Sequence, residues 1–338
     1  MLYLVLLFWF VGIIIGFAIP NGIGLAILCI IGFAITGIYM YCIWPRIPFT
    51  SALLKIASSI IKQFKGTICL SFIMVPVTLI FFIIWLLAAV YAFSEGNDVA
   101  LLLLLSLYWG FEICKNILHA TVCGVTGAWY FSKDTSEPTK PALKRTMTTI
   151  FGSICFGSMI VAILQVFKAV LRSQARGPCG CIILMILSCI ESLVRKFNMY
   201  AYVHCAVYNN NFIDAASKTF SLFQSKGLYA IVNDQLTGLV MTCGGLMSFI
   251  VSFAIGFGLA FAFFPNYMNV IVAILYGIIG GYLGAVLCMI VLRVIPSSVA
   301  ALFVCFAEDP GALKDNRPEA FDRLVKSNDK LNTMAVQG

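Results

Sequence analysis

Residues 67–93 read TICLSFIMVPVTLIFFIIWLLAAVYAF, a run of 27 positions with no charged side chain. A helix needs about 20 predominantly apolar residues to cross the hydrocarbon core of a bilayer, so this run is long enough to span it. Pro76 lies inside the run, and because proline lacks the backbone N–H and clashes with the preceding turn, we expect a kink there. The run predicts a membrane-spanning α-helix.

The rest of the chain has the same character. Of its 338 residues, 61% are hydrophobic and 11% are charged, whereas soluble domains have about 25% charged residues. No water-soluble core would bury this much apolar side chain, so we predict an all-α, polytopic transmembrane helix bundle of about eight spans. The expected spans are residues 2–19, 23–43, 67–93, 100–131, 148–170, 179–195, 229–264 and 268–295.

Segments outside the spans differ in their pattern. Residues 47–65 carry apolar side chains at helical spacing with lysines interspersed, which predicts an amphipathic helix lying on the membrane surface. The expected span 179–195 contains Glu191, and a re-entrant segment remains an alternative there. The composition divides the chain into a transmembrane domain, residues 1–305, and a cytoplasmic tail, residues 306–338.

The distribution of Lys and Arg predicts the orientation, because short cytoplasmic loops carry an excess of both. Segments with four basic residues each are 45–65, 132–147 and 195–226, and connections with none are 20–22, 94–99 and 265–267. Only the connection 171–178, with Arg172 and Arg176, breaks the alternation. With eight spans, the basic segments and both termini face the cytoplasm.

Several classes of function are disfavoured. The net charge of +8 does not indicate a nucleic-acid partner, because the basic residues lie in short loops without interleaved aromatics. The motifs GxxxxGK[ST], HExxH and GxSxG are absent, so we expect no enzyme and no ATP-driven transport by this chain alone. We also expect no metal and no cofactor, because His119 and His204 are the only histidines and Cys179 with Cys181 lacks metal-site spacing.

One polar stripe lies inside an expected span. Glu112, Lys115, Asn116 and His119 share one helical face, with Tyr108 one turn before them. Intramembrane charges are expensive, so each suggests a functional site. Two interpretations stay open: Glu112 and Lys115 neutralise each other as an ion pair, or the stripe lines a polar cavity in which Glu112 attracts a cation.

Aromatic side chains favour one kind of ligand for such a cavity. Tyr108 and Trp109 lie beside Glu112, and aromatic faces hold quaternary ammonium groups through cation–π attraction. We expect Tyr276 and Tyr282 of the last span to complete the site. Asp234, in the triplet Asn233-Asp234-Gln235, is either a further binding residue or a structural group near the headgroups.

Two local patterns predict structure. Glu191 precedes Arg195 by four residues, the favourable order for an ion pair on a helix. Small residues recur every four positions in span 229–264, and glycine pairs at the same spacing occur in span 268–295. Such stripes let helices approach closely, either as static packing or as a surface that slides during gating. These small residues are Gly244, Ser248, Ser252, Gly256 and Ala260, with Gly277, Gly280, Gly281 and Gly284.

Four segments match motifs of one known family. They are Arg46-Ile47-Pro48-Phe49; Tyr108-Trp109 through Glu112, Asn116, His119, Gly124 and Trp129-Tyr130; Pro141-Ala142-Leu143-Lys144-Arg145 followed by Phe151-Gly152-Ser153-Ile154-Cys155-Phe156-Gly157-Ser158; and Phe197-Asn198 with Tyr200-Ala201-Tyr202, Asn211-Phe212 and Ala215-Ala216. Together they resemble the choline transporter-like family, in its fungal and plant-like branch, over residues 46 to about 306.

The resemblance implies transport of choline and related amines without ATP by a protein with about ten spans and cytoplasmic termini. Eight spans, like ten, place both termini on the same side of the membrane, so the resemblance implies that two N-terminal spans are lacking. Met1 indeed opens directly into an expected span. We therefore predict a transporter of choline or a related small organic cation, facilitative or proton-coupled, in the plasma membrane. Glu112 would be its counter-charge and His119 a pH-sensitive group. The alternative is a non-transporting membrane organiser or a lipid-handling protein, such as a scramblase or a trafficking adaptor.

Overall fold

A computed structural model of the chain describes residues 2–18, 23–44, 47–94, 99–133, 136–174, 177–263 and 270–327. The expected turns at 20–22 and 265–267, and the side chains of Cys179 and Asp234, lie outside the described residues. The chain divides into two compact units, residues 1–52 with 324–338, and residues 53–323. Each unit is described by itself.

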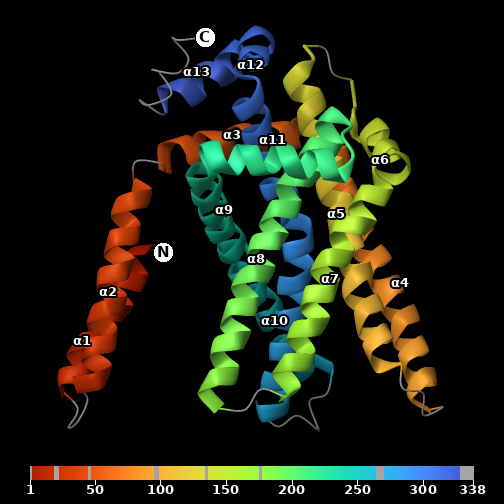
Figure 1. The fold of residues 1–338 in the computed structure, drawn as a ribbon. Coiled ribbons are helices and arrows are strands. Elements are labelled where there is room, and N and C mark those ends of the chain that lie inside the picture. The colour runs from red at the N-terminus through yellow and green to blue at the C-terminus, as the bar shows by residue number, and fades with distance from the viewer. Residues whose placement is uncertain are drawn as a thin grey trace. The chain divides into compact units, whose positions relative to one another are not determined.

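The described residues are helical and contain no strand, which confirms the predicted all-α class (Figure 1). Five described helical stretches are long and apolar enough to cross a membrane: Gly66–Ala92, Ala100–Phe131, Phe151–Ser173, Thr237–Ala260 and Val270–Glu308. The count of eight spans stays a prediction. The helices are α1 (Leu2–Ala18), α2 (Ile23–Ile43), α3 (Ile47–Gln63), α4 (Gly66–Ser94), α5 (Ala100–Phe131), α6 (Thr139–Thr148), α7 (Phe151–Gln174), α8 (Gly177–Tyr208), α9 (Phe212–Phe263), α10 (Val270–Leu292), α11 (Val294–Glu308), α12 (Pro310–Asn316) and α13 (Pro318–Lys326).

The first unit is built on the pair of α1 and α2, which pack against each other. Gly12 faces Cys29, and a Cβ at Gly16 would lie only 2.6 Å from the backbone nitrogen of Ala26. The glycines therefore let the two helices approach closely, as small residues do between helices in lipid.

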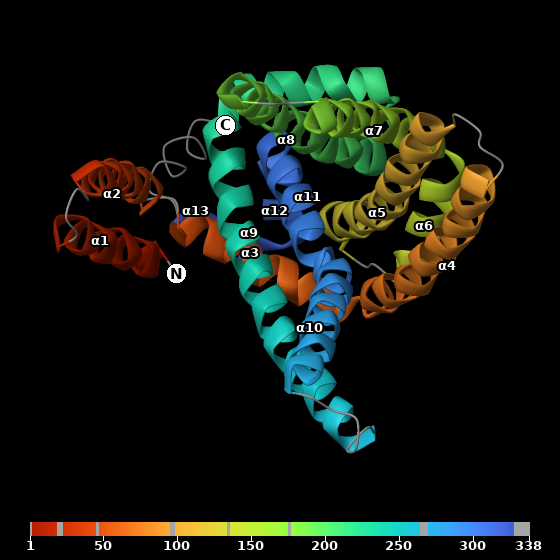
Figure 2. The same cartoon turned by 90° about the horizontal axis from the view of Figure 1, so that it is seen from below.

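The second unit is organised around α5, which packs against α4, α6, α7, α8 and α11 (Figure 2). Apolar residues of α3, α4, α5 and α11 form one cluster, in which Ile61, Leu118 and Val294 are buried. The amphipathic pattern of α3 is confirmed: Ile56 and Ile60 are buried, whereas Lys55 and Lys62 are exposed. Part of its apolar face thus packs on protein rather than on lipid.

The pair of α9 and α10 confirms the predicted close approach of the last two long helices. A Cβ at Gly280 would lie 3.2 Å from the backbone oxygen of Ser252, and one at Gly284 would overlap the Ser252 side chain. Ser248 Oγ donates a hydrogen bond of 2.9 Å to the backbone oxygen of Gly284. The small residues therefore bring the two backbones together and also supply a polar contact across the interface.

Residues 196–228 are largely helical. α8 is continuous from Gly177 to Tyr208, and α9 begins at Phe212 after a three-residue turn. Asn209 has φ of 59°, a left-handed conformation that asparagine tolerates, and Asn211 Oδ1 caps α9 by accepting from the Asp214 backbone N–H. In Figure 1 the first part of α9 runs across the ends of the long helices, and its second part turns to run along α10.

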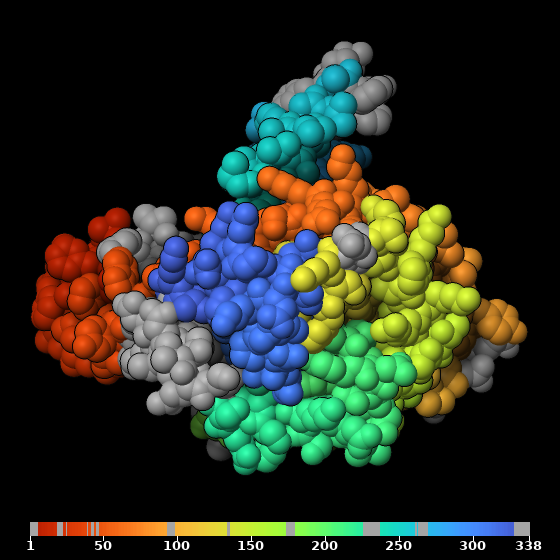
Figure 3. Space-filling model, turned by 90° about the horizontal axis from the view of Figure 1, so that it is seen from above, coloured from red at the N-terminus to blue at the C-terminus, as the bar shows by residue number. Residues whose placement is uncertain are grey.

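The end of the second unit is helical, including part of the segment from residue 306 onward that the sequence predicts to be a polar tail. α10 ends at Leu292, a turn at Arg293 follows, and α11 is buried from Val294 to Phe306 except at two positions. α12 then lies at the carboxyl end of α5, where Tyr130 Oη donates to the backbone oxygen of Asp309 at 2.7 Å. Figure 3 shows this blue C-terminal surface beside the yellow residues that follow α5.

Candidate functional site

Glu112 lies near the middle of α5, about 18 Å along the helix axis from its first residue. It is 5% exposed. Its Oε1 accepts hydrogen bonds from Lys115 Nζ at 2.7 Å and from Arg195 Nη1 at 2.5 Å. Because two cations already hold this carboxylate, the ion-pair interpretation of Glu112 and Lys115 is confirmed.

The ion pairs continue from α5 to α8 and α7. Arg195 uses Nε and Nη2 to donate to Glu191 Oε1 at 2.9 Å and 2.8 Å, which confirms the predicted ion pair of Glu191 and Arg195. Lys168 of α7 donates to the other oxygen of Glu191. Five charges of alternating sign therefore link three helices, in the order Lys115, Glu112, Arg195, Glu191 and Lys168.

A cavity of about 290 Å³ opens beside this network. Its wall combines α5, α7, α8 and α9 with the joint between α10 and α11. Three predicted site residues lie in this wall: Glu112, Asn116 and His119. The structure thus brings the polar stripe of α5 to a cavity, in addition to pairing Glu112. The remaining lining residues are Val161, Arg195, Lys196, Asn198, Met199, Thr237, Gly238, Met241, Arg293, Pro296, Ser297 and Val299.

The neutral polar groups of the cavity are held by neighbouring helices. Asn116 Nδ2 donates to Ser158 Oγ of α7 at 2.9 Å. His119 Nε2 lies 2.9 Å from the backbone oxygen of Met199, and its Nδ1 lies 2.9 Å from Ser297 Oγ. Since a carbonyl only accepts, Nε2 carries a proton. Ser297 Oγ has a single proton, and it lies within hydrogen-bond distance of two acceptors, His119 Nδ1 and the backbone oxygen of Arg293 at 2.8 Å.

The predicted aromatic residues lie elsewhere. Tyr108 and Trp109 are half-buried one turn before Glu112, and Trp109 Nε1 donates to the backbone oxygen of Cys155 at 3.0 Å. Tyr276 and Tyr282 are 49% and 67% exposed on α10. None of the four lines the cavity. On α10 the glycine face packs against α9, so the tyrosines at other angles around the helix turn outward.

Twelve of the fifteen described lining residues are absent from the predicted site, and among them are two polar residues at the joint of α10 and α11, Arg293 and Ser297. Arg293 is the single charged residue between positions 270 and 307, and an ionisable residue inside a span indicates a functional site by default. That signal was sufficient to find it. Ser297 reaches His119 across 178 positions of sequence, and no local pattern predicts such a contact.

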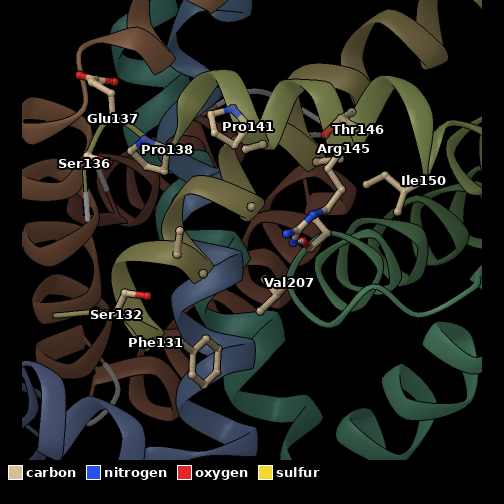
Figure 4. A pocket seen from close by; sticks show the side chains of 16 residues that line it. Phe131, Ser132, Ser136, Glu137, Pro138, Pro141, Arg145, Thr146, Ile150 and Val207 are labelled. Atoms are coloured by element: carbon tan, nitrogen blue, oxygen red, sulfur yellow. Dashed lines mark hydrogen bonds between the residues drawn. The ribbon is translucent and has the colours of Figure 1, made fainter. Parts of the chain in front are cut away.

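A second cavity of about 420 Å³ lies between α5, α6 and α8, at the carboxyl end of α5. Figure 4 shows Arg145 of α6 extending toward α8 near Val207, and its Nη1 donates to the backbone oxygen of Ala206 at 3.4 Å. None of the predicted site residues lines this cavity. The smaller cavity beside Glu112 is therefore the candidate functional site.

Comparison with known proteins gives a family match. Residues 27–311 match the model of a family described as plasma-membrane choline transporter. The match covers most of the chain, including every helix that lines the cavity.

Curated relatives agree with this match. A CTL-like protein of Dictyostelium discoideum is 30% identical over 312 residues, covering 87% of this chain and 55% of the relative. Protein PNS1 of Debaryomyces hansenii is 29% identical over 325 residues, covering 85% and 63%, and protein PNS1 of Kluyveromyces lactis is 30% identical over 334 residues, covering 87% and 60%. The chain thus spans little more than half the length of these relatives.

Proposed function

This chain belongs to the choline transporter family, and from that premise we propose that it carries choline or a related small organic cation across a membrane without ATP. The plasma membrane is the compartment that the family description suggests. The transport is facilitative or coupled to protons.

One observation supports this proposal above the others, namely the polar cavity about halfway along α5. Polar groups inside a spanning bundle are expensive and mark solute pathways. The cavity volume of about 290 Å³ is close to the lower end of the range for small-molecule sites. Its apolar wall, formed in part by Met199 and Met241, suits a methylated amine.

The proposed role of Glu112 is that of an exchangeable counter-charge. Lys115 and Arg195 hold its carboxylate in this conformation. An entering amine competes with them, and Arg195 keeps Glu191 as its second partner when it leaves Glu112. Tyr108 and Trp109 are proposed to contact the amine on its way into the cavity, and Asn116 and His119 to complete the polar wall.

The test is uptake of labelled choline into proteoliposomes, with Glu112→Gln compared with Glu191→Gln. Both variants remove one carboxylate from the same ion-pair network, but only Glu112 lines the cavity. We expect Glu112→Gln to lower uptake at least about tenfold, the loss of one charge-assisted contact, and Glu191→Gln to lower it much less. Equal losses would assign both carboxylates to folding alone.

The alternative function predicts a different result in the same vesicles. If wild-type protein gives no uptake above empty liposomes, transport of choline by this chain is contradicted. Movement of fluorescent lipid between the leaflets of those vesicles would then support the lipid-handling alternative.

A further inference from the structure

The cavity beside Glu112 is lined by more basic than acidic groups. Among its described lining residues, the only carboxylate is Glu112, whereas Arg195, Lys196 and Arg293 are basic. Like charges disfavour the entry of a cation, so an amine that carries a negative group of its own fits this wall better than one that does not. The charge of the wall therefore needs its own explanation.

The ion-pair network does not use all of these basic groups. All three guanidinium nitrogens of Arg195 donate hydrogen bonds to Glu112 or Glu191. Both carboxylates are also held by lysines, Glu112 by Lys115 and Glu191 by Lys168. Among the described residues, neither the guanidinium of Arg293 nor the ammonium of Lys196 forms an ion pair or a side-chain hydrogen bond.

The surroundings of Arg293 increase its need for a negative partner. Glu112 attracts its charge from a distance, but Arg195 repels it, and Lys115 lies within electrostatic reach as well. A charge taken out of water is costly unless a counter-charge compensates it. The planar guanidinium presents parallel N–H groups that match a carboxylate or a phosphate in a bidentate contact.

We propose that the Arg293 side of the cavity binds an oxyanion, the carboxylate or phosphate group of a zwitterionic amine. The oxyanion lies against Arg293 and Lys196, and the methylated ammonium lies toward Met199, Met241 and Glu112. The amine half of this inference rests on the proposed function, whereas the oxyanion half stands without it.

The test uses the full chain purified in phosphate-free detergent buffer, with calorimetric titration of phosphocholine, inorganic phosphate and choline. We expect phosphocholine to bind wild type more tightly than choline does. Arg293→Gln should weaken phosphocholine and phosphate at least about tenfold, the effect of one lost charged hydrogen bond, and change choline little. No binding of phosphocholine or phosphate to wild type overturns the proposal, and so does unchanged binding in Arg293→Gln.

Three further variants keep the result independent of folding. Arg293→Lys retains the positive charge but lacks the parallel N–H groups of the guanidinium, and we expect it to bind phosphocholine with intermediate affinity. Arg172→Gln removes an exposed arginine of α7 that does not line the cavity, and should bind as wild type does. Asp234→Asn should also bind as wild type; if phosphate binds only to this variant, Asp234 is the partner of Arg293 and the proposal is wrong.

Two further measurements distinguish a lipid headgroup from a soluble ligand as the source of the oxyanion, and test the oxyanion site and the transport proposal separately. Displacement of phosphocholine by phosphatidate micelles, without any binding of inorganic phosphate, supports the oxyanion site but overturns a soluble zwitterion as its ligand. Wild type that binds phosphocholine yet takes up no choline keeps the oxyanion site and contradicts the proposed function. Choline uptake without any oxyanion binding supports the proposed function and overturns the oxyanion site.

Discussion

At the scale of single residues, the two histidines of the chain are buried in contrasting ways. His119 is 5% exposed, and both of its ring nitrogens have hydrogen-bond partners. His204 is fully buried, and neither of its nitrogens has a partner among the described residues. A buried polar group with partners stabilises the fold, whereas one without them costs free energy.

The pair gives a matched test of that difference. We expect His119→Phe to destabilise the protein by about 2 kcal/mol, because the hydrogen bonds that the ring makes to Met199 and Ser297 are lost in the interior. His204→Phe replaces unpaired nitrogens by carbon, at the cost of fitting a somewhat larger ring, so it should destabilise the protein less than His119→Phe does. Thermal unfolding of both variants in detergent measures the contrast, and equal losses would contradict it.

The pH dependence of His204→Phe provides a second readout. Burial, and then the charge of Lys218, lower the pKa of His204 to about 4, and this residue lies beyond the expected span 179–195. In the unfolded chain the His204 imidazole becomes protonated as pH falls below about 6.5, whereas in the folded chain it stays neutral until about pH 4. The wild-type protein therefore loses stability as pH falls from about 6.5 toward 4. His204→Phe should lose less over the same interval.

At the scale of elements, the interface of α9 and α10 depends on backbone approach. A Cβ at Gly256 would lie 2.9 Å from the backbone oxygen of Tyr276, which cannot move without the helix. A Cβ at Gly258, two residues later on the same helix, would meet no atom of a neighbouring element within 4 Å. Close packing is therefore confined to one face of α9.

We predict that Gly256→Ala separates the two helices and lowers stability by about 1–3 kcal/mol through overpacking. Gly258→Ala should be neutral or stabilising by about 0.5–1 kcal/mol, because alanine restricts the unfolded chain more than glycine does. Thermal midpoints of the purified variants measure both. If uptake falls in Gly256→Ala while stability is unchanged, the sliding interpretation of this interface is favoured over static packing.

At the scale of the whole molecule, the chain is built for lipid. Large apolar side chains such as Leu87 of α4 and Ile279 of α10 are exposed, whereas charged groups such as Glu112 and Glu191 are buried between helices. Lipid tails are as apolar as these exposed side chains, so leaving them outside costs little there. The orientation of this arrangement follows from the loop charges and stays a prediction.

Epitope tags test that orientation. With eight spans, tags at both termini should be hidden from antibody in intact cells and become accessible after permeabilisation. A tag inserted between Glu95 and Gly96 should be accessible without permeabilisation, because the connection 94–99 carries no basic residue. An exposed C-terminal tag with a hidden N-terminal tag would indicate that 179–195 does not cross the membrane.

Local features of the site could be predicted because they depend on neighbours within one helical turn. Glu112 with Lys115 and Glu191 with Arg195 are three and four residues apart, so helical geometry alone brings each pair together. The aromatic wall could not be derived in this way. Whether Tyr276 faces a cavity or lipid depends on how α10 is rotated against α9, and its glycines decide that rotation.

The sequence by itself determined the membrane class, the close glycine contact of the last two long helices and the spacing that allows the two local ion pairs. These follow from the length of apolar runs and from helical spacing, which involve only nearby residues. Only the tertiary structure decided that Arg195 reaches Glu112 across 83 positions and that Arg293 and Ser297 stand at the same cavity. Such contacts depend on the packing of separate helices, where many rotations satisfy the same apolar pattern and only one brings these charges together.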